Sequence, residues 1–60
     1  MNRIVIVEDE INIRETLQEI LEFSGYEVFT ASNGKLGYTL ILEKEPDLVL
    51  CDVNMPELDG

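Results

Sequence analysis

The sequence has no histidine, no tryptophan and a single cysteine, Cys51. With no second cysteine and no histidine, the chain can form neither an internal disulfide nor a structural zinc site. A lone cysteine is typical of a reducing compartment, so we expect a cytoplasmic protein. The longest early apolar run, residues 4–7, is too short for a signal peptide or a membrane span. We therefore expect no association with a membrane.

Basic residues are also scarce. Four lysines and arginines stand against thirteen acidic residues, which gives a formal net charge of −9. An acidic surface repels phosphate groups, and the few basic residues form no stripe along which a nucleic acid backbone could lie. The composition therefore argues against nucleic acid as a partner of this chain.

The chain is short enough for one small domain only. At 60 residues, folding buries roughly 60% of the surface of the unfolded chain, and such domains are marginally stable on their own. Chains of this size commonly gain stability from a partner, so self-association is an early expectation.

Three strand-like segments alternate with two helical ones. Residues 3–7 form a continuous β-branched run, typical of a strand buried on both faces. Residues 26–30 alternate and are less apolar, which favours an edge strand, and residues 47–51 predict a third buried strand. Strands that alternate with helices imply right-handed crossovers and a parallel sheet. The predicted fold class is therefore α/β, with the element order βαβαβ.

The two helices are predicted from apolar residues at helical spacing. The first should begin at a capping box formed by Asn12 and Glu15 and end at Gly25. The second should span residues 35–45, weakened by about 1 kcal/mol at Gly37 relative to alanine. The residues expected to face the core are Ile13, Leu17, Ile20, Leu21 and Ser24 in the first helix, and Leu36, Leu40, Ile41 and Leu42 in the second.

Acidic side chains follow the first and third predicted strands. Glu8 and Asp9 come directly after the first, and Asp52 follows the third. Ligands of parallel sheets bind beyond the carboxyl ends of the strands, so neighbouring strands would bring these carboxylates together. Mg²⁺ resolves their mutual repulsion, because it takes oxygen ligands. The alternative is a solvated acidic run that caps the first helix. The second acid at a matching strand end favours a site.

The same acidic run argues against a flavin- or nucleotide-binding half domain. A phosphate-binding turn needs glycines and backbone N–H groups directed at an anion. Residues 8–10 are all acidic and would repel that anion.

Three stretches carry a resemblance to a known family: IVIVEDE (residues 4–10), ASNG (31–34) and PDLVLCDVNMPELDG (46–60). Together they resemble the first half of a response-regulator receiver domain of two-component signalling. The resemblance implies a flavodoxin-like half domain with a three-stranded parallel sheet in the order 2-1-3. Residues 1–60 are accordingly expected to be a truncated receiver domain that lacks the later strands and helices.

The resemblance also implies a role for each acidic residue. Asp52 matches the phosphoacceptor, which receives a phosphoryl group from a phosphohistidine of a sensor histidine kinase. Asp9 matches a ligand of Mg²⁺, and Glu8 matches the neighbour that holds metal-bound water. The backbone carbonyl of Asn54 matches the group that completes the metal site. A phosphoacceptor of this kind is not expected to be an enzyme.

The family's later strands carry a hydroxyl residue and a lysine that have no counterpart here. We therefore expect this chain alone to be inactive or weakly active. Its third strand would keep an unpaired apolar edge, and such edges recruit other strands. Two copies pairing antiparallel about a two-fold axis would form a homodimer with one continuous sheet. The alternative function is thus a self-associating folding or assembly fragment without phosphotransfer.

Overall fold

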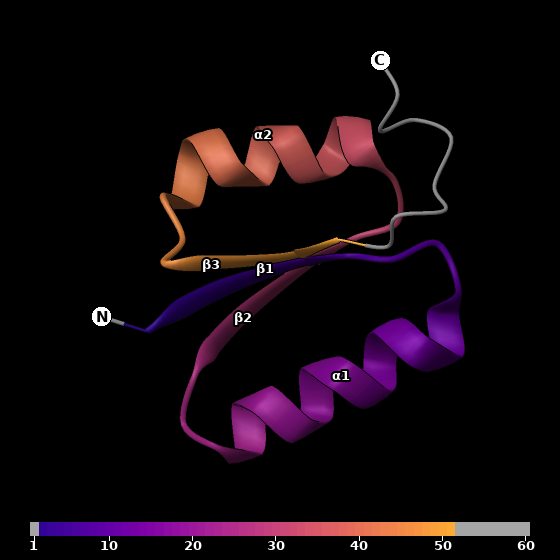
Figure 1. The fold of residues 1–60 in the computed structure, drawn as a ribbon, viewed down its shortest axis with the longest axis vertical. Coiled ribbons are helices and arrows are strands. Elements are labelled where there is room, and N and C mark those ends of the chain that lie inside the picture. Colours follow the sequence, from indigo (N-terminus) through magenta and orange to yellow (C-terminus); the bar gives the residue numbers. More distant parts are fainter. Residues whose placement is uncertain (1, 52–60) are drawn as a thin grey trace.

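The computed structural model describes residues 2–51. Its three strands form one parallel sheet in the order β2-β1-β3, so the predicted fold and the edge position of the second strand are confirmed (Figure 1). The second and third strands each begin one residue later than predicted. The elements in chain order are β1 (Arg3–Val7), α1 (Ile11–Phe23), β2 (Glu27–Ala31), α2 (Gly34–Lys44) and β3 (Leu48–Cys51).

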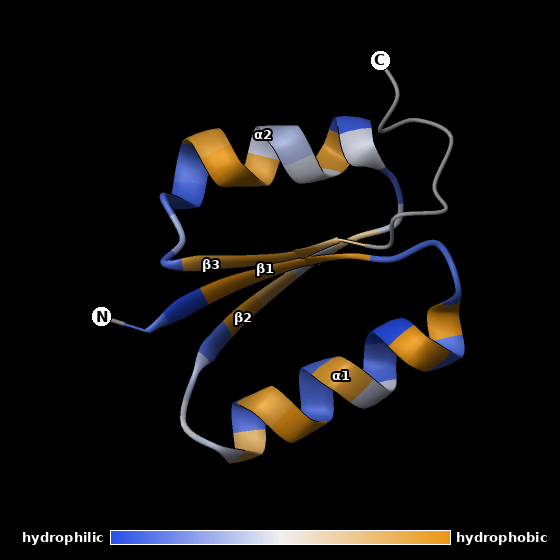
Figure 2. Ribbon diagram, in the orientation of Figure 1, coloured by the Kyte–Doolittle hydropathy of each residue, from blue (hydrophilic) through white to orange (hydrophobic). Residues whose placement is uncertain are grey.

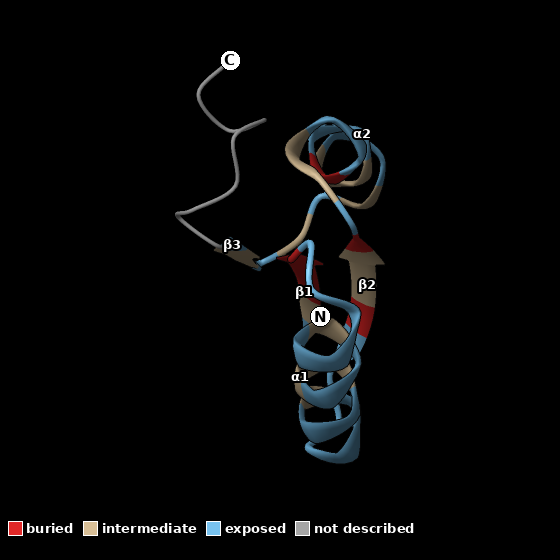
Figure 3. Ribbon diagram, turned by 90° about the vertical axis from the view of Figure 1, so that its right-hand side faces the viewer, coloured by how far each residue is buried: buried red, intermediate tan, exposed pale blue. Residues whose placement is uncertain are grey.

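The two helices cover opposite faces of the sheet, with β1 in the centre (Figures 1 and 3). Successive side chains of a strand point to opposite faces, so β1 contributes to two cores. Its apolar residues, and those of its neighbours, form the hydrophobic layer that Figure 2 shows between the helices. On the α2 side the core consists of Val5, Val7 and Ala31, packed by Leu40 and Ile41; on the α1 side it consists of Ile4, Ile6 and Val28, packed by Leu17 and Leu21.

Helix α1 begins earlier than the sequence predicts. Glu10 is its N-cap, and the Oε1 atom of Glu10 accepts a hydrogen bond of 3.0 Å from the backbone N–H of Asn12. The predicted Asn12–Glu15 capping box is therefore wrong, because Asn12 already lies inside the helix. The end at Gly25 is confirmed. Gly25 has φ of 100°, and Tyr26 N–H donates to the carbonyl of Leu21 across 3.1 Å, as in a Schellman motif.

Helix α2 lies unusually close to the central strand. Gly37 is buried, and a Cβ atom there would stand 2.5 Å from Cγ2 of Val7. The sequence predicted this glycine only as a weak point of the helix. In the structure its missing side chain lets the helix backbone approach β1.

Each helix also exposes apolar residues that the sequence placed in the core. Ile13 and Ile20 of α1 are 49% and 56% exposed, and Leu36 and Leu42 of α2 are more than half exposed. Within residues 2–51, the sheet is covered by one helix on each face, so the flanks of both helices remain open. No helix of this part of the chain is both long and apolar enough to cross a bilayer.

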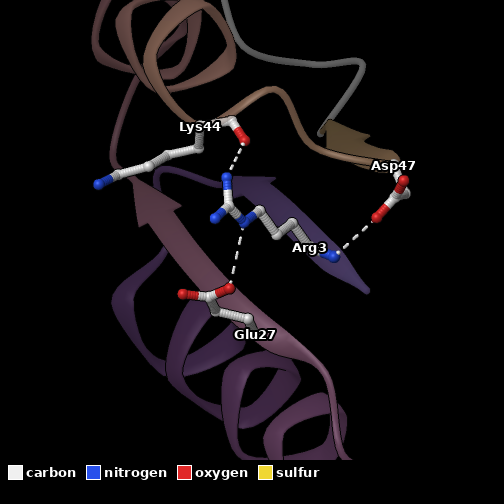
Figure 4. Close-up of polar contacts among 4 residues, drawn as sticks. All are labelled: Arg3, Glu27, Lys44 and Asp47. Carbon is white, nitrogen blue, oxygen red and sulfur yellow. Dashed lines mark hydrogen bonds and ion pairs between the residues drawn. The ribbon is translucent and has the colours of Figure 1, made fainter. Parts of the chain in front are cut away.

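Arg3 ties the amino-terminal end of the sheet together (Figure 4). Its Nε atom lies 3.2 Å from Oε1 of Glu27, and its Nη1 donates to the carbonyl of Lys44 across 2.8 Å. The backbone N–H of Arg3 donates to Oδ2 of Asp47, 2.9 Å away, and the N–H of Asp47 donates back to the carbonyl of Arg3. One side chain thus joins β1, β2 and the end of α2, where a positive charge suits the helix dipole.

Candidate functional site

The carboxyl ends of the three strands share one rim of the sheet. Val7 of β1 lies in register with Ala31 of β2 on one side and with Cys51 of β3 on the other. The first and third strands are therefore neighbours, as the convergence of the acidic residues requires. Glu8 and Asp9 continue the chain from Val7, and Asp52 is the next residue in the sequence after Cys51. Asp52 and Asn54 lie outside the described residues.

Glu8 is held through three of its groups. Its backbone N–H donates to the carbonyl of Ala31 (3.0 Å), and its carboxylate Oε2 accepts from the N–H of Glu10 (3.1 Å). Its carbonyl accepts from Nη1 of Arg14 (2.9 Å). Glu8 is 8% exposed, whereas Asp9 is exposed. One acid of the pair is thus fixed in the fold while the next is accessible from solvent.

A groove of about 420 Å³ lies beside Glu8, between α1 and the strands β1 and β3. Among the described residues of its lining, Glu8 is the one that carries a charge. The groove joins the acidic rim to the exposed flank of α1. Its lining residues are Ile6, Val7, Glu8, Ile13, Leu17, Leu50 and Cys51.

The donor atoms at this rim suit a hard divalent cation. Mg²⁺ is bound in proteins by one or two carboxylates, with waters or phosphate oxygens completing an octahedron. Glu8 and Asp9 supply two carboxylates at one strand end. Residues 2–51 contain no cluster of three or more side chains able to hold a metal ion. The described residues therefore supply two carboxylates of the kind that Mg²⁺ binds, but not a complete metal site.

The alternative interpretation of the acidic run was a cap of the first helix, and Glu10 of that run is the N-cap of α1. The contact of Arg14 was not predicted: its guanidinium donates to the carbonyl of Glu8. A signal for Arg14 was available, since a cation in the first turn of a helix opposes the helix dipole.

A three-stranded parallel sheet in the order 2-1-3, with acidic residues after its first strand, defines a flavodoxin-like receiver half domain. Comparison with known families agrees: the response regulator receiver domain matches residues 4–60. The chain therefore belongs to the receiver domain family of two-component response regulators.

Several curated proteins are similar over nearly the whole chain. Regulatory protein AtoC of Escherichia coli is 43% identical over all 60 residues, which make up 13% of its length. A probable transcriptional regulator, ycf27, of Cyanophora paradoxa is 47% identical over 97% of this chain and 24% of its own. Sporulation initiation phosphotransferase F of Bacillus subtilis is 40% identical over 97% of this chain and 47% of its own. The chain thus spans less than half the length of these relatives.

Proposed function

We propose that this chain is a phosphoacceptor module, the first part of a receiver domain, in which Asp52 accepts a phosphoryl group from a sensor histidine kinase. The observation that carries the proposal is the register of Val7 beside Cys51. It makes Glu8, Asp9 and Asp52 the continuations of adjacent strand ends. Membership of the receiver family supports the same assignment. A free cysteine at residue 51 supports a cytoplasmic location.

The proposed reaction is the displacement of a histidine by a carboxylate. An oxygen of Asp52 attacks the phosphorus atom of the phosphohistidine, the P–N bond breaks, and its electron pair stays on the imidazole nitrogen. The product is an acyl phosphate on Asp52. Carboxylates are competent nucleophiles for this transfer, which depends mainly on positioning and on neutralisation of charge.

Glu8, Asp9 and Asp52, with the carbonyl of Asn54, would hold Mg²⁺ at this rim. The cation would supply the positive charge that the acidic residues cannot offer to phosphoryl oxygens. The buried position of Glu8 orients the loop, and the exposed Asp9 remains accessible. The exposed carboxylate of Asp9 thus follows the strand next to that of the nucleophile.

The test is phosphorylation by a small acyl phosphate with and without Mg²⁺, read by mass spectrometry of the intact chain. We expect a slow, Mg²⁺-dependent gain of one phosphoryl group, absent in Asp52→Asn and reduced in Asp9→Asn. The matched control is Asp47→Asn, because Asp47 lies at the opposite end of β3. Equal labelling of Asp52→Asn, or no labelling of the parent chain, would contradict the proposal.

The open edge of β3 favours a second candidate function, self-association. Among the described residues β3 pairs with β1 alone, and its four residues, Leu48–Cys51, carry no charge. Leu48 is 51% exposed. We infer that two copies pair their β3 edges antiparallel about a two-fold axis, which buries apolar surface without bringing β3 charges together.

Equilibrium sedimentation with and without millimolar Mg²⁺ tests this second candidate. A dimer is expected, and a folded monomer at high protein concentration would refute it. A dimer that neither responds to Mg²⁺ nor is labelled by the acyl phosphate would favour assembly, and not phosphotransfer, as the function of this chain. A molar mass that increases with Mg²⁺ would show that cation binding and self-association are coupled.

A further inference from the structure

Arg14 occupies a position that helix electrostatics disfavours. It is the fourth residue of α1, next to the helix end that carries partial positive charge. Acidic residues stabilise that end, and the N-cap of α1, Glu10, is one of them. A residue that violates a local rule is commonly retained for a role elsewhere in the structure. The contacts of Arg14 indicate what that role is.

Arg14 reaches back over the loop between β1 and α1. Its backbone N–H donates to the carbonyl of Glu10 (2.9 Å), as the helix requires, and its Nη1 donates to the carbonyl of Glu8 (2.9 Å). The residue is half-buried, and the second bond is partly shielded from solvent. The guanidinium therefore holds a backbone group rather than a surface carboxylate.

The carbonyl of Glu8 belongs to the peptide that links Glu8 to Asp9. On its other side, the N–H of Glu8 is bonded to the carbonyl of Ala31. A planar peptide fixed through its carbonyl, on a residue already fixed through its N–H, has little freedom to rotate. The direction in which the chain leaves towards Asp9 is set by these two bonds.

We propose that Arg14 is a positioning residue for the acidic pair, which fixes the Glu8–Asp9 peptide so that the two carboxylates can bind a divalent cation together. The inference rests on the proposed function, because that function assigns a cation to these carboxylates. Arg14 would thus contribute to the cation site without supplying a ligand atom. Residues that orient metal ligands commonly change metal affinity by about 10-fold or more when replaced.

The sign of the effect separates positioning from simple electrostatics. The guanidinium is positive, so removing its charge near two carboxylates should strengthen cation binding if charge were all that mattered. If Arg14 positions the loop, its removal should weaken binding. Replacing Arg14 therefore makes the two explanations predict opposite results.

The experiment is a calorimetric Mg²⁺ titration of the 60-residue chain and three variants. Arg14→Met removes both the charge and the contact, and Arg14→Lys keeps the charge and one donor group. Lys35→Met, at an exposed position of α2, is the control for loss of one positive charge. We expect roughly 10-fold weaker Mg²⁺ binding in Arg14→Met, partial recovery in Arg14→Lys, and unchanged or tighter binding in Lys35→Met. Binding in Arg14→Met as tight as in Lys35→Met would overturn the proposal.

Amide hydrogen exchange gives a readout that needs no metal. The N–H groups of Glu10 and Asn12 bond to the carboxylates of Glu8 and Glu10, so their exchange reports the order of this loop. Both should exchange faster in Arg14→Met than in Lys35→Met, while the amides of β1 stay protected if the variant is folded. If the parent chain does not bind Mg²⁺, the cation site of the proposed function fails, and unchanged exchange at Glu10 and Asn12 would separately overturn the role of Arg14.

Discussion

The two sides of the molecule differ in how well their apolar residues are covered. We call one the closed side, which includes Val28 and Phe29 of β2 and Gly37 of α2. The other is the open side, which includes Ile13 and Ile20 of α1 and Leu48 of β3. On the closed side Val28 is 8% exposed, and the ammonium of Lys44 lies 5.0 Å from the ring centroid of Phe29. On the open side the three apolar residues are about half exposed.

Charge follows the same division. The β2 edge carries Glu27, which is paired with Arg3, whereas Leu48–Cys51 of β3 is uncharged. Charged residues on an edge strand discourage further pairing, and an uncharged edge invites it. The contrast shows that the β2 edge carries a charge that discourages pairing with another strand, while the uncharged β3 edge is suited to such pairing.

The largest difference between the two sides should appear in core truncations. Val28→Ala removes two buried methyl groups and should lower the free energy of unfolding by about 2 kcal/mol, including the cavity left behind. Leu48→Ala removes more atoms, but from a half-exposed side chain, and should cost less than about 1 kcal/mol in the monomer. Urea unfolding at low protein concentration measures both. A larger loss for Leu48→Ala would abolish the distinction between the sides.

The close approach of α2 to β1 should be the next most sensitive feature. Gly37→Ala improves helix propensity by about 1 kcal/mol, but the added Cβ overlaps Val7 and overpacking costs roughly 1–3 kcal/mol. We expect a net loss of about 1 kcal/mol in thermal or urea unfolding. The Val7→Ala background is the control, since there the same substitution should become neutral or stabilising. Equal losses in both backgrounds would show that the contact with Val7 is not the cause.

A charge placed on the open edge should affect assembly more than stability. Leu48→Lys puts a solvated ammonium where two copies would pair, and we expect at least a tenfold weaker dimer, which is about 1.4 kcal/mol. Leu42→Lys makes the same chemical change at an exposed position of α2 and serves as the matched control. Sedimentation should show a shift to monomer in the first variant alone. If both variants dissociate equally, net charge and not the β3 edge governs association.

The smallest effect should come from the ion pair on the closed edge. Arg3 and Glu27 are 41% and 60% exposed in their side chains, and exposed pairs contribute about 0.2–1 kcal/mol. Glu27→Gln should therefore destabilise the chain by roughly 0.5 kcal/mol at low salt, with a smaller effect at high salt because ions screen the pair. A loss that persists unchanged at high salt would point to packing by Glu27 instead of charge.

The sequence predicted the sheet well because the signals for it are local. The apolar run of β1 and the strand–helix alternation indicate parallel strands, whereas the strand order came from the resemblance to receiver domains. It predicted helix ends less well. Glycine itself favours the left-handed conformation that ends a helix, so the end at Gly25 was predictable. The choice between Glu10 and Asn12 as N-cap depends on which side chain accepts a hydrogen bond from the backbone N–H groups at the start of the helix.

The place of the acidic pair at the end of β1 was predictable from the sequence, whereas the contacts that hold the pair were not. Glu8 and Asp9 follow a recognisable strand, so their place on the rim could be inferred. The contact of Arg14 depends on the path of the loop, and the fit of Gly37 against Val7 depends on the distance between two layers. Neither quantity is encoded in a local pattern. The roles of Asp52 and Asn54 stay predictions.

The central place of β1 has a consequence for how the chain comes together during synthesis. Of the three strands, β1 is synthesised before the two that pair with it, and its contacts from Arg3 reach Glu27 and Asp47, 24 and 44 residues later. Until those residues emerge, Ile4–Val7 is an unpaired apolar segment, and contacts between distant residues form slowly. The strand best protected in the finished sheet is thus the one longest exposed to wrong partners while the chain is being made.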